Sequence, residues 1–326
     1  MHIIELSYLK HLSILADDDY RGHHWFDDGD RTGTGVRRMA SPVQIDCSTE
    51  ITQNNEIPLF TIRPIWWGGL IAEFCWMMRG NTSLESLDDL HQGASKLWRP
   101  WALDSRIPDT QYGSVYTVRH IGKGYGYQFN GPLKKLETAI LAIQAQPFTR
   151  HACFSLWEQT DLKHMALRPC HGCWLTFRAL RDPNAPEHTR ILTLAHTQRS
   201  QDIAVGAPYN VVFYQLLLRV IVAWLNAQAR HREKVKWVEG WVTHKVDDLH
   251  LYVNHLDQAR EMLARRESLD GCLLSVLPPT ATCAFNPPPE WGDASLADAM
   301  RKLHPSMFVL ANYEPLAPAI KLPVAV

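Results

Sequence analysis

Strand-like and helix-like segments alternate in an irregular order along this chain, and that order most constrains its fold. In the second half, apolar patterning predicts strands at 151–157, 173–179 and 190–195, a helix over 209–229, a strand at 236–242 and a helix over 250–265. No Gly-x-Gly-x-x-Gly motif, phosphate-binding loop or internal repeat accompanies them. We therefore predict an α/β (α+β) fold in which long helices pack on a mixed sheet, and not a doubly wound nucleotide-binding fold.

The first half of the chain is more broken, and its patterning indicates one domain with insertions. It predicts helices at 3–15, 70–78 and 133–144, a loop over 20–34, a strand at 59–62 and a hairpin or irregular insertion between 101 and 127. We place the insertion itself around 102–122. The proline-rich stretch 277–289 is predicted to be a surface excursion, because too little chain follows it for a second domain. We therefore predict a single domain over residues 1–326.

Charge and hydropathy exclude two classes of partner. Lys and Arg number 33 against 34 Asp and Glu, so no global field attracts nucleic acid or an anionic membrane. The longest apolar stretch, 211–225, contains Gln215 and Arg219 and is shorter than the roughly 20 residues that a membrane span requires. We interpret it as a buried helix, and we predict neither a nucleic-acid partner nor a membrane partner.

The cysteines favour a reducing compartment. There are seven, an odd and scattered set, and Met1-His2 leads into a mixed segment that does not resemble a signal peptide. We therefore expect free thiols in the cytoplasm. Cys170 and Cys173 form a Cys-x-x-Cys pair without a second pair, and the 16 His lack ligand spacing, so we predict no metal site.

Two side chains are candidates for acid/base or nucleophilic chemistry. Cys170 lies at a predicted strand edge between Pro169 and His171, where a neighbouring cation would activate its thiol. From composition alone, a small buried hydrophobe is the more frequent role for such a cysteine. Glu73 lies within an apolar helix, as either a general acid/base with a raised pKa or a helix-edge residue that reaches solvent.

Two further segments carry polar groups that suit a ligand. Residues 199–202 (RSQD) place a guanidinium, a hydroxyl and a carboxylate close together, a platform for an anion but also a common loop composition. His250 and Tyr252 alternate on one face of a short extended piece, where they either hold a ligand hydroxyl or cap the following helix.

Taken together and in order, these pieces resemble thymidylate synthase and its deoxynucleotide hydroxymethylase relatives. The matching segments are RTGTG (31–35), AEFCWMMRGNT (72–82), LRPCH (167–171), QRSQD (198–202), GAPYN (206–210), HLYVNH (250–255) and IKLPVAV (320–326). The resemblance implies a catalytic domain that dimerises through its sheet, a pyrimidine deoxynucleotide as substrate and 5,10-methylenetetrahydrofolate as one-carbon donor. It also implies that Cys170 adds to C6 of the pyrimidine, and that Glu73 is the general acid/base.

The resemblance also assigns the binding residues. Arg31, Arg199 and Ser200 correspond to phosphate ligands, and Arg150 to an arginine that reaches the phosphate of the partner subunit. His250 and Tyr252 correspond to the pair that holds the sugar 3′-hydroxyl, and Asp202 to the carboxylate that anchors the pterin. Trp98 and Trp101 correspond to the wall of the folate site, and Arg63 and the C-terminal Val326 to residues near the folate tail. Tyr125 corresponds to a tyrosine that lines the site, with Tyr116 as the rival placement.

Asn210 carries the information about the base. A side-chain amide offers a donor and an acceptor, which suit O4 and N3–H of uracil, whereas cytosine-specific relatives are expected to have Asp there. The resemblance therefore favours dUMP over dCMP.

The family shares an electrophilic methylene at C5, which hydride converts to a methyl group and water to a hydroxymethyl group. The 320–326 tail resembles a segment that closes over the ligands, so we favour methylation of dUMP to dTMP. Leu175, Glu158 and His151 depart from the family pattern and keep 5-hydroxymethylation as the alternative, with dUMP favoured over dCMP as its substrate. A catalytically silent nucleotide-binding homologue is a remote third. The sequence leaves open whether the chain is encoded by a virus and acts in a host cytoplasm.

Overall fold

The central element of the fold is a five-stranded mixed sheet. The computed structural model describes residues 3–18, 24–27, 32–46, 55–108, 115–181, 183–232, 235–270 and 281–322. The strand order is β3 (Val43–Asp46), β10 (Lys236–Val246), β8 (Thr189–Gln198), β7 (Trp174–Leu180) and β6 (Cys153–Phe154). β8 and β10 are parallel, and the other neighbours are antiparallel. The predicted mixed sheet is confirmed.

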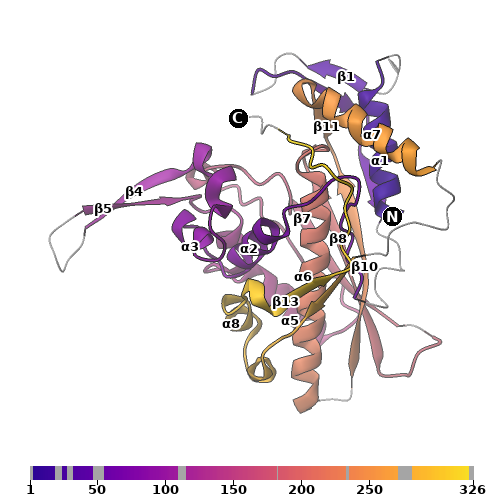
Figure 1. The fold of residues 1–326 in the computed structure, drawn as a ribbon. Coiled ribbons are helices and arrows are strands. Elements are labelled where there is room, and N and C mark those ends of the chain that lie inside the picture. The colour runs from indigo at the N-terminus through magenta and orange to yellow at the C-terminus, as the bar shows by residue number, and fades with distance from the viewer. Residues whose placement is uncertain are drawn as a thin grey trace.

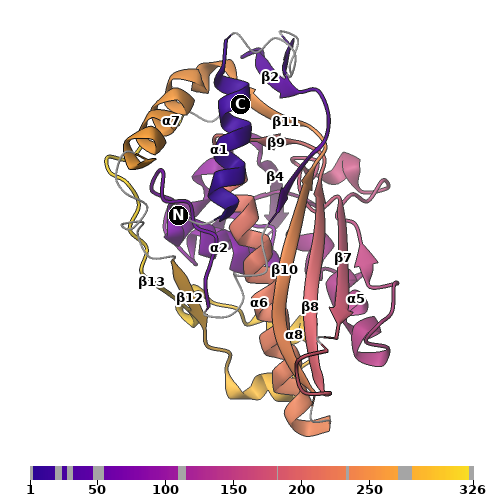
Figure 2. The same ribbon diagram turned by 90° about the vertical axis from the view of Figure 1, so that its right-hand side faces the viewer.

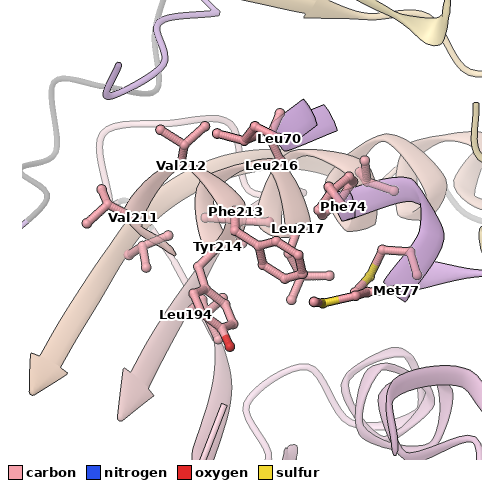
Figure 3. Close-up of a cluster of buried hydrophobic side chains, with 14 of the residues drawn as sticks. Leu70, Phe74, Met77, Leu194, Val211, Val212, Phe213, Tyr214, Leu216 and Leu217 are labelled. Atoms are coloured by element: carbon pink, nitrogen blue, oxygen red, sulfur yellow. The ribbon is translucent and has the colours of Figure 1, made fainter. Parts of the chain in front are cut away.

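One long helix, α6 (Ala207–Arg232), runs along this sheet (Figure 1). Figure 3 shows its side chains Phe213 and Leu217 between Leu194 of β8 and Phe74 of α2 (Trp67–Met78), and all four are buried. By length and composition α6 could cross a membrane, but 78% of its most apolar stretch is buried within the fold. It is therefore the predicted core helix, which is apolar around most of its circumference because it is enclosed on most sides.

A second, four-stranded sheet continues the first. Its order is β1 (His24–Asp27), β2 (Val36–Met39), β11 (Leu249–Tyr252) and β9 (Gln201–Asp202). The parallel strands β8 and β10 both break and resume as β9 and β11. Backbone hydrogen bonds bridge the break, from Asp247 N to Gln198 O (2.9 Å) and from Gln201 N to Asp248 O (2.9 Å). The break therefore brings the 199–202 segment and the residues just before His250 to one place.

Helices α1 (Ile3–Ala16) and α7 (Leu256–Asp270) pack beside each other near this second sheet (Figure 2). The buried Glu5 of α1 accepts hydrogen bonds from Thr61 N (2.7 Å) and Ile62 N (2.6 Å). The strand predicted at 59–62 is therefore wrong, because these N–H groups bind a carboxylate and not a neighbouring strand.

A hairpin of β4 (Leu103–Pro108) and β5 (Val115–His120) projects from the body in the region predicted as an insertion (Figure 1). The remaining elements are α3 (Leu84–Asp88), α4 (Gly126–Asn130), α5 (Lys135–Ala145), α8 (Leu296–Arg301), the pair β12 (Thr282–Phe285) and β13 (Phe308–Ala311), and short 3₁₀ helices at Ala94–Leu97, Arg99–Trp101, Leu162–His164, Val253–His255, Pro289–Gly292 and Pro305–Met307.

Several predicted boundaries are corrected. The predicted loop over 20–34 contains strand β1, which pairs with β2. Of the predicted strand 151–157, only Cys153–Phe154 is paired with β7. The predicted helix from His250 begins at Leu256, because His250 belongs to β11. In the stretch 277–289, residues 281–289 are described, and there β12 pairs with β13 with Cys283 fully buried.

Candidate active site

Cys170 lies in the turn that leads into β7, held by backbone contacts on both sides. Arg199 N donates to Cys170 O (3.0 Å), and Cys170 N donates to the Tyr125 hydroxyl oxygen (2.9 Å). The same hydroxyl lies 3.3 Å from the Cys170 Sγ. Because the tyrosine oxygen already accepts the N–H, its own proton is available to donate to the sulfur. Tyr125 thus positions the nucleophile and stabilises its thiolate form.

Two opposing effects act on the Cys170 thiol. Burial raises its pKa, while the Tyr125 hydroxyl and the Arg199 guanidinium act to lower it. Arg199 itself is tied to the same loop, since its Nε donates to Pro169 O (2.9 Å) and its guanidinium lies 5.5 Å from the Trp157 ring. The cation therefore stays next to the thiol.

Glu73 projects from α2 into a pocket of about 520 Å³. Burial raises the pKa of its carboxyl to about 7, although a hydrogen bond from Trp98 partly offsets the effect. A carboxyl that titrates near neutrality can both donate and accept a proton at working pH. This is the property that a general acid/base needs.

The pocket collects residues from distant parts of the chain. It is lined by Arg63, Pro64, Trp66, Gly69, Leu70, Glu73, Ala94, Lys96, Leu97, His171, Val205, Gly206, Tyr209, Asn210, Phe213, Ile320 and Leu322. Its size suits a small-molecule ligand, and its wall is mostly apolar with a few polar groups that can orient one.

Asp202, Arg63 and His250 meet where the second sheet begins. His250 and Asp202 are register partners in the parallel pair of β11 and β9. Asp202 Oδ1 accepts from Ala204 N (2.9 Å), and Arg63 Nη2 donates to Ala204 O (2.8 Å). Arg63 is itself buried and lines the pocket, so its guanidinium is fixed at this wall.

Trp98 and Tyr252 each pack against another residue of the candidate site. The Trp98 ring lies 5.7 Å from that of Tyr125, edge to face, and Trp101 follows at the end of the next 3₁₀ helix. The Tyr252 ring lies 5.2 Å from His250.

Other predicted site residues do not line the pocket or lie outside the described residues. Ser200 lies at the break between β8 and β9, next to Arg199. Arg150 is exposed in the segment before β6, outside the pocket lining. Arg31 and Val326 lie outside the described residues.

Asn210 stands in the first turns of α6 and lines the pocket. Its Nδ2 donates to Gln198 Oε1 (3.2 Å). The second N–H of that amide and its Oδ1 remain to bind a base.

Sequence reasoning assigned no role to His171, His196, His244 and Gln198. His171 lines the pocket, stacks on Tyr125 with ring centroids 4.5 Å apart, and has its pKa lowered to about 3 by burial. The others lie at the ends of β8 and β10, beyond the predicted ends of those strands at residues 195 and 242. Had the alternation of buried and exposed residues in these two strands been extended by a few residues, it would have predicted that these side chains lie on the buried face.

A sequence model described as thymidylate synthase matches residues 21–326. The chain belongs to the thymidylate synthase family. Among curated members, the thymidylate synthase of Ascaris suum is 28% identical over 322 residues, covering 93% of this chain and 94% of that protein. The enzyme of Sinorhizobium fredii is 27% identical over 263 residues, covering 73% of this chain and 79% of that protein.

The fold agrees with that of the family. The crystal structure of thymidylate synthase from T4 phage superposes with a TM-score of 0.71 at 23% identity, covering 98% of this chain and 99% of the phage chain. Within the part of the chain that the structure describes, no group of three His, Cys, Asp or Glu is arranged to hold a metal ion.

Proposed function

We propose that this protein transfers a one-carbon unit from 5,10-methylenetetrahydrofolate to C5 of dUMP and so produces dTMP. The observation that carries the proposal is one pocket into which Glu73, with its pKa near 7, and Asn210 both project beside the Cys170 loop. Membership of the thymidylate synthase family supports methylation over the other reactions considered.

The nucleophile and its neighbours perform the first step. Cys170 Sγ forms a bond to C6 of the pyrimidine, and the electron pair of the C5–C6 double bond moves toward C5 and O4. The permanently charged Arg199 and the Tyr125 hydroxyl favour the thiolate that attacks. The folate supplies the one-carbon unit and then the hydride.

Glu73 moves protons within the pocket. In its protonated form it donates a hydrogen bond, directly or through water, toward the carbonyl where negative charge develops. In its ionised form it accepts the proton that leaves C5. A pKa of about 7 keeps both forms populated at neutral pH.

The C-terminal segment favours hydride over water as the final reagent. Ile320 and Leu322 line the pocket and add apolar surface to its wall. An apolar cover lowers the local concentration of water at the reactive methylene, so hydride transfer outcompetes hydration. Leu175, one departure from the family pattern, is fully buried.

Mass spectrometry of the product tests the proposal. The pure protein is incubated with dUMP and methylenetetrahydrofolate, and the absorbance of dihydrofolate is followed in parallel. We expect dTMP and an equal amount of dihydrofolate. A hydroxymethyl product with tetrahydrofolate would establish the alternative reaction, and turnover of neither dUMP nor dCMP would reduce the protein to a nucleotide-binding homologue.

We also propose a homodimer that forms through the five-stranded sheet. Along β7, Leu175 and Phe177 face the core, while Trp174, which precedes them, is half exposed and Arg178, which follows them, is exposed. Exposed tryptophan on a sheet face suits a protein partner. Sedimentation equilibrium is expected to give twice the chain mass, with Trp174→Glu shifted toward monomer. A wild-type monomer at micromolar concentration contradicts this arrangement.

A further inference from the structure

We propose that the buried pair His196 and His244 sets which pyrimidine the enzyme accepts, by fixing the orientation of the Asn210 amide through Gln198. The inference rests on the proposed function, because it assigns specificity within that same site. Neither histidine lines the pocket, so both are positioning residues.

The direction of the hydrogen-bond chain follows from its first member. Gly172 N, two residues after the nucleophile, donates to His196 Nε2 (2.8 Å). A backbone N–H can only donate, so His196 Nε2 carries no proton. Burial lowers the pKa of His196 well below its usual value, so the ring is neutral and its single proton lies on Nδ1.

The same reasoning fixes which nitrogen of His244 carries the proton. His196 Nδ1 lies 3.1 Å from His244 Nδ1 and donates to it. Burial lowers the pKa of His244 to about 3, so this ring is also neutral and keeps its proton on Nε2. That atom lies 3.1 Å from Gln198 Oε1, to which it donates, and 3.3 Å from Gln201 Nε2. Tyr214 stacks on His196 with centroids 3.6 Å apart and holds the ring plane.

Gln198 can therefore present only its oxygen to Asn210. Its Nε2 donates to Ser200 O (2.9 Å), and its Oε1 accepts from His244, from Gln201 Nε2 (3.2 Å) and from Asn210 Nδ2 (3.2 Å). A flipped Gln198 would point N–H groups at these donors. Because the oxygen is an acceptor only, Asn210 must turn its Nδ2 toward it.

This orientation discriminates between bases. An asparagine amide rotated by half a turn exchanges its donor and its acceptor, and so could pair with N3 and the amino group of cytosine as well as with N3–H and O4 of uracil. The chain from Gly172 to Gln198 removes that freedom. Selection of uracil thus depends on two histidines that do not touch the base, and it is linked to the loop that holds Cys170.

The test compares kcat/KM for dUMP with kcat/KM for dCMP. His244→Leu removes the donor to Gln198 with little change in volume, and the ratio is expected to fall about tenfold, as for one lost hydrogen bond. His244→Gln retains an N–H at similar reach and should restore most of the ratio. Asn210→Asp gives the size of the effect when the amide itself is removed.

Val242→Ala is the matched control, because Val242 lies on the same strand and the same buried face as His244 but makes no side-chain hydrogen bond. It should lower the melting temperature and leave the ratio unchanged. Equal loss of kcat/KM for both nucleotides in His244→Leu, with no rescue by His244→Gln, would show a purely structural role and overturn the inference.

Equilibrium binding separates this inference from the proposed function. If the wild type binds dUMP but does not methylate it, the ratio of the two nucleotide Kd values replaces the kinetic ratio and decides the role of His244. A wild type that binds neither nucleotide overturns both proposals.

Discussion

Replacing Cys170 by Ala should lower kcat/KM for dUMP by about 10⁴-fold or more, because the bond to C6 can no longer form. The protein should still fold, since a small side chain replaces another of similar size and the hydrogen bonds of the loop are made by backbone groups and Tyr125. Steady-state formation of dihydrofolate measures the loss, and calorimetry with dUMP checks that the nucleotide site is intact.

Cys173→Ala is the matched control. Cys173 lies in the same turn, and its thiol donates to Pro169 O (3.6 Å) and Cys170 O (3.7 Å). We expect its activity to stay within a few-fold of wild type. Comparable loss in the two variants would indicate damage to the loop, and retained turnover in Cys170→Ala would exclude this thiol as the nucleophile.

Replacing Glu73 by Gln should lower kcat by about 10²-fold or more while making the folded state more stable at high pH. The pKa of Glu73 is about 7 in the fold, above its usual value of 4.5. Stability from this carboxyl is therefore fully present below pH 4.5 and is lost as the pH rises through 7. Glutamine has no such dependence, so the variant should gain at most about 3 kcal/mol over wild type between pH 4.5 and 8.

Urea unfolding at pH 5 and pH 8 measures this difference. Glu85→Gln provides a control of opposite sign, because hydrogen bonds from its own backbone N–H and from Ser83 outweigh partial burial and hold the pKa of Glu85 below its usual value. The stability that Glu85 contributes is lost as the pH falls. If Glu73→Gln and wild type differ by the same amount at both pH values, the carboxyl is not buried as described.

The sequence predicted the helices and the mixed sheet because their apolar patterns are long. The run 211–225 is buried on most sides in α6, and the helix over 70–78 is recovered in α2. The boundaries of short elements were less certain. The extended piece with His250 and Tyr252 is confirmed as β11 through its pairing with β2 and β9, but the helix predicted from His250 begins only at Leu256.

Some residues of the candidate site could be predicted from the sequence and others could not. Cys170 and Glu73 stood out from their sequence context and gained their roles from likeness to the family, whereas Asn210 was found by that likeness alone. His196 and His244 have no motif, and their function depends on β8 and β10 lying side by side. A parallel pairing between segments so distant in sequence is a tertiary fact that local patterns do not contain.

The contact of Glu5 with Thr61 and Ile62 has a consequence for the order of folding. The chain that follows Ile62 forms one wall of the pocket, with Arg63 and Trp66. This wall is anchored by a carboxylate 56 residues earlier, so closing a long loop must precede its completion. That loop is shorter than the 139 residues that separate Phe74 of α2 from its ring partner Phe213 of α6, so docking of the first helix closes this wall of the pocket at a lower entropic cost than assembly of the core around α6.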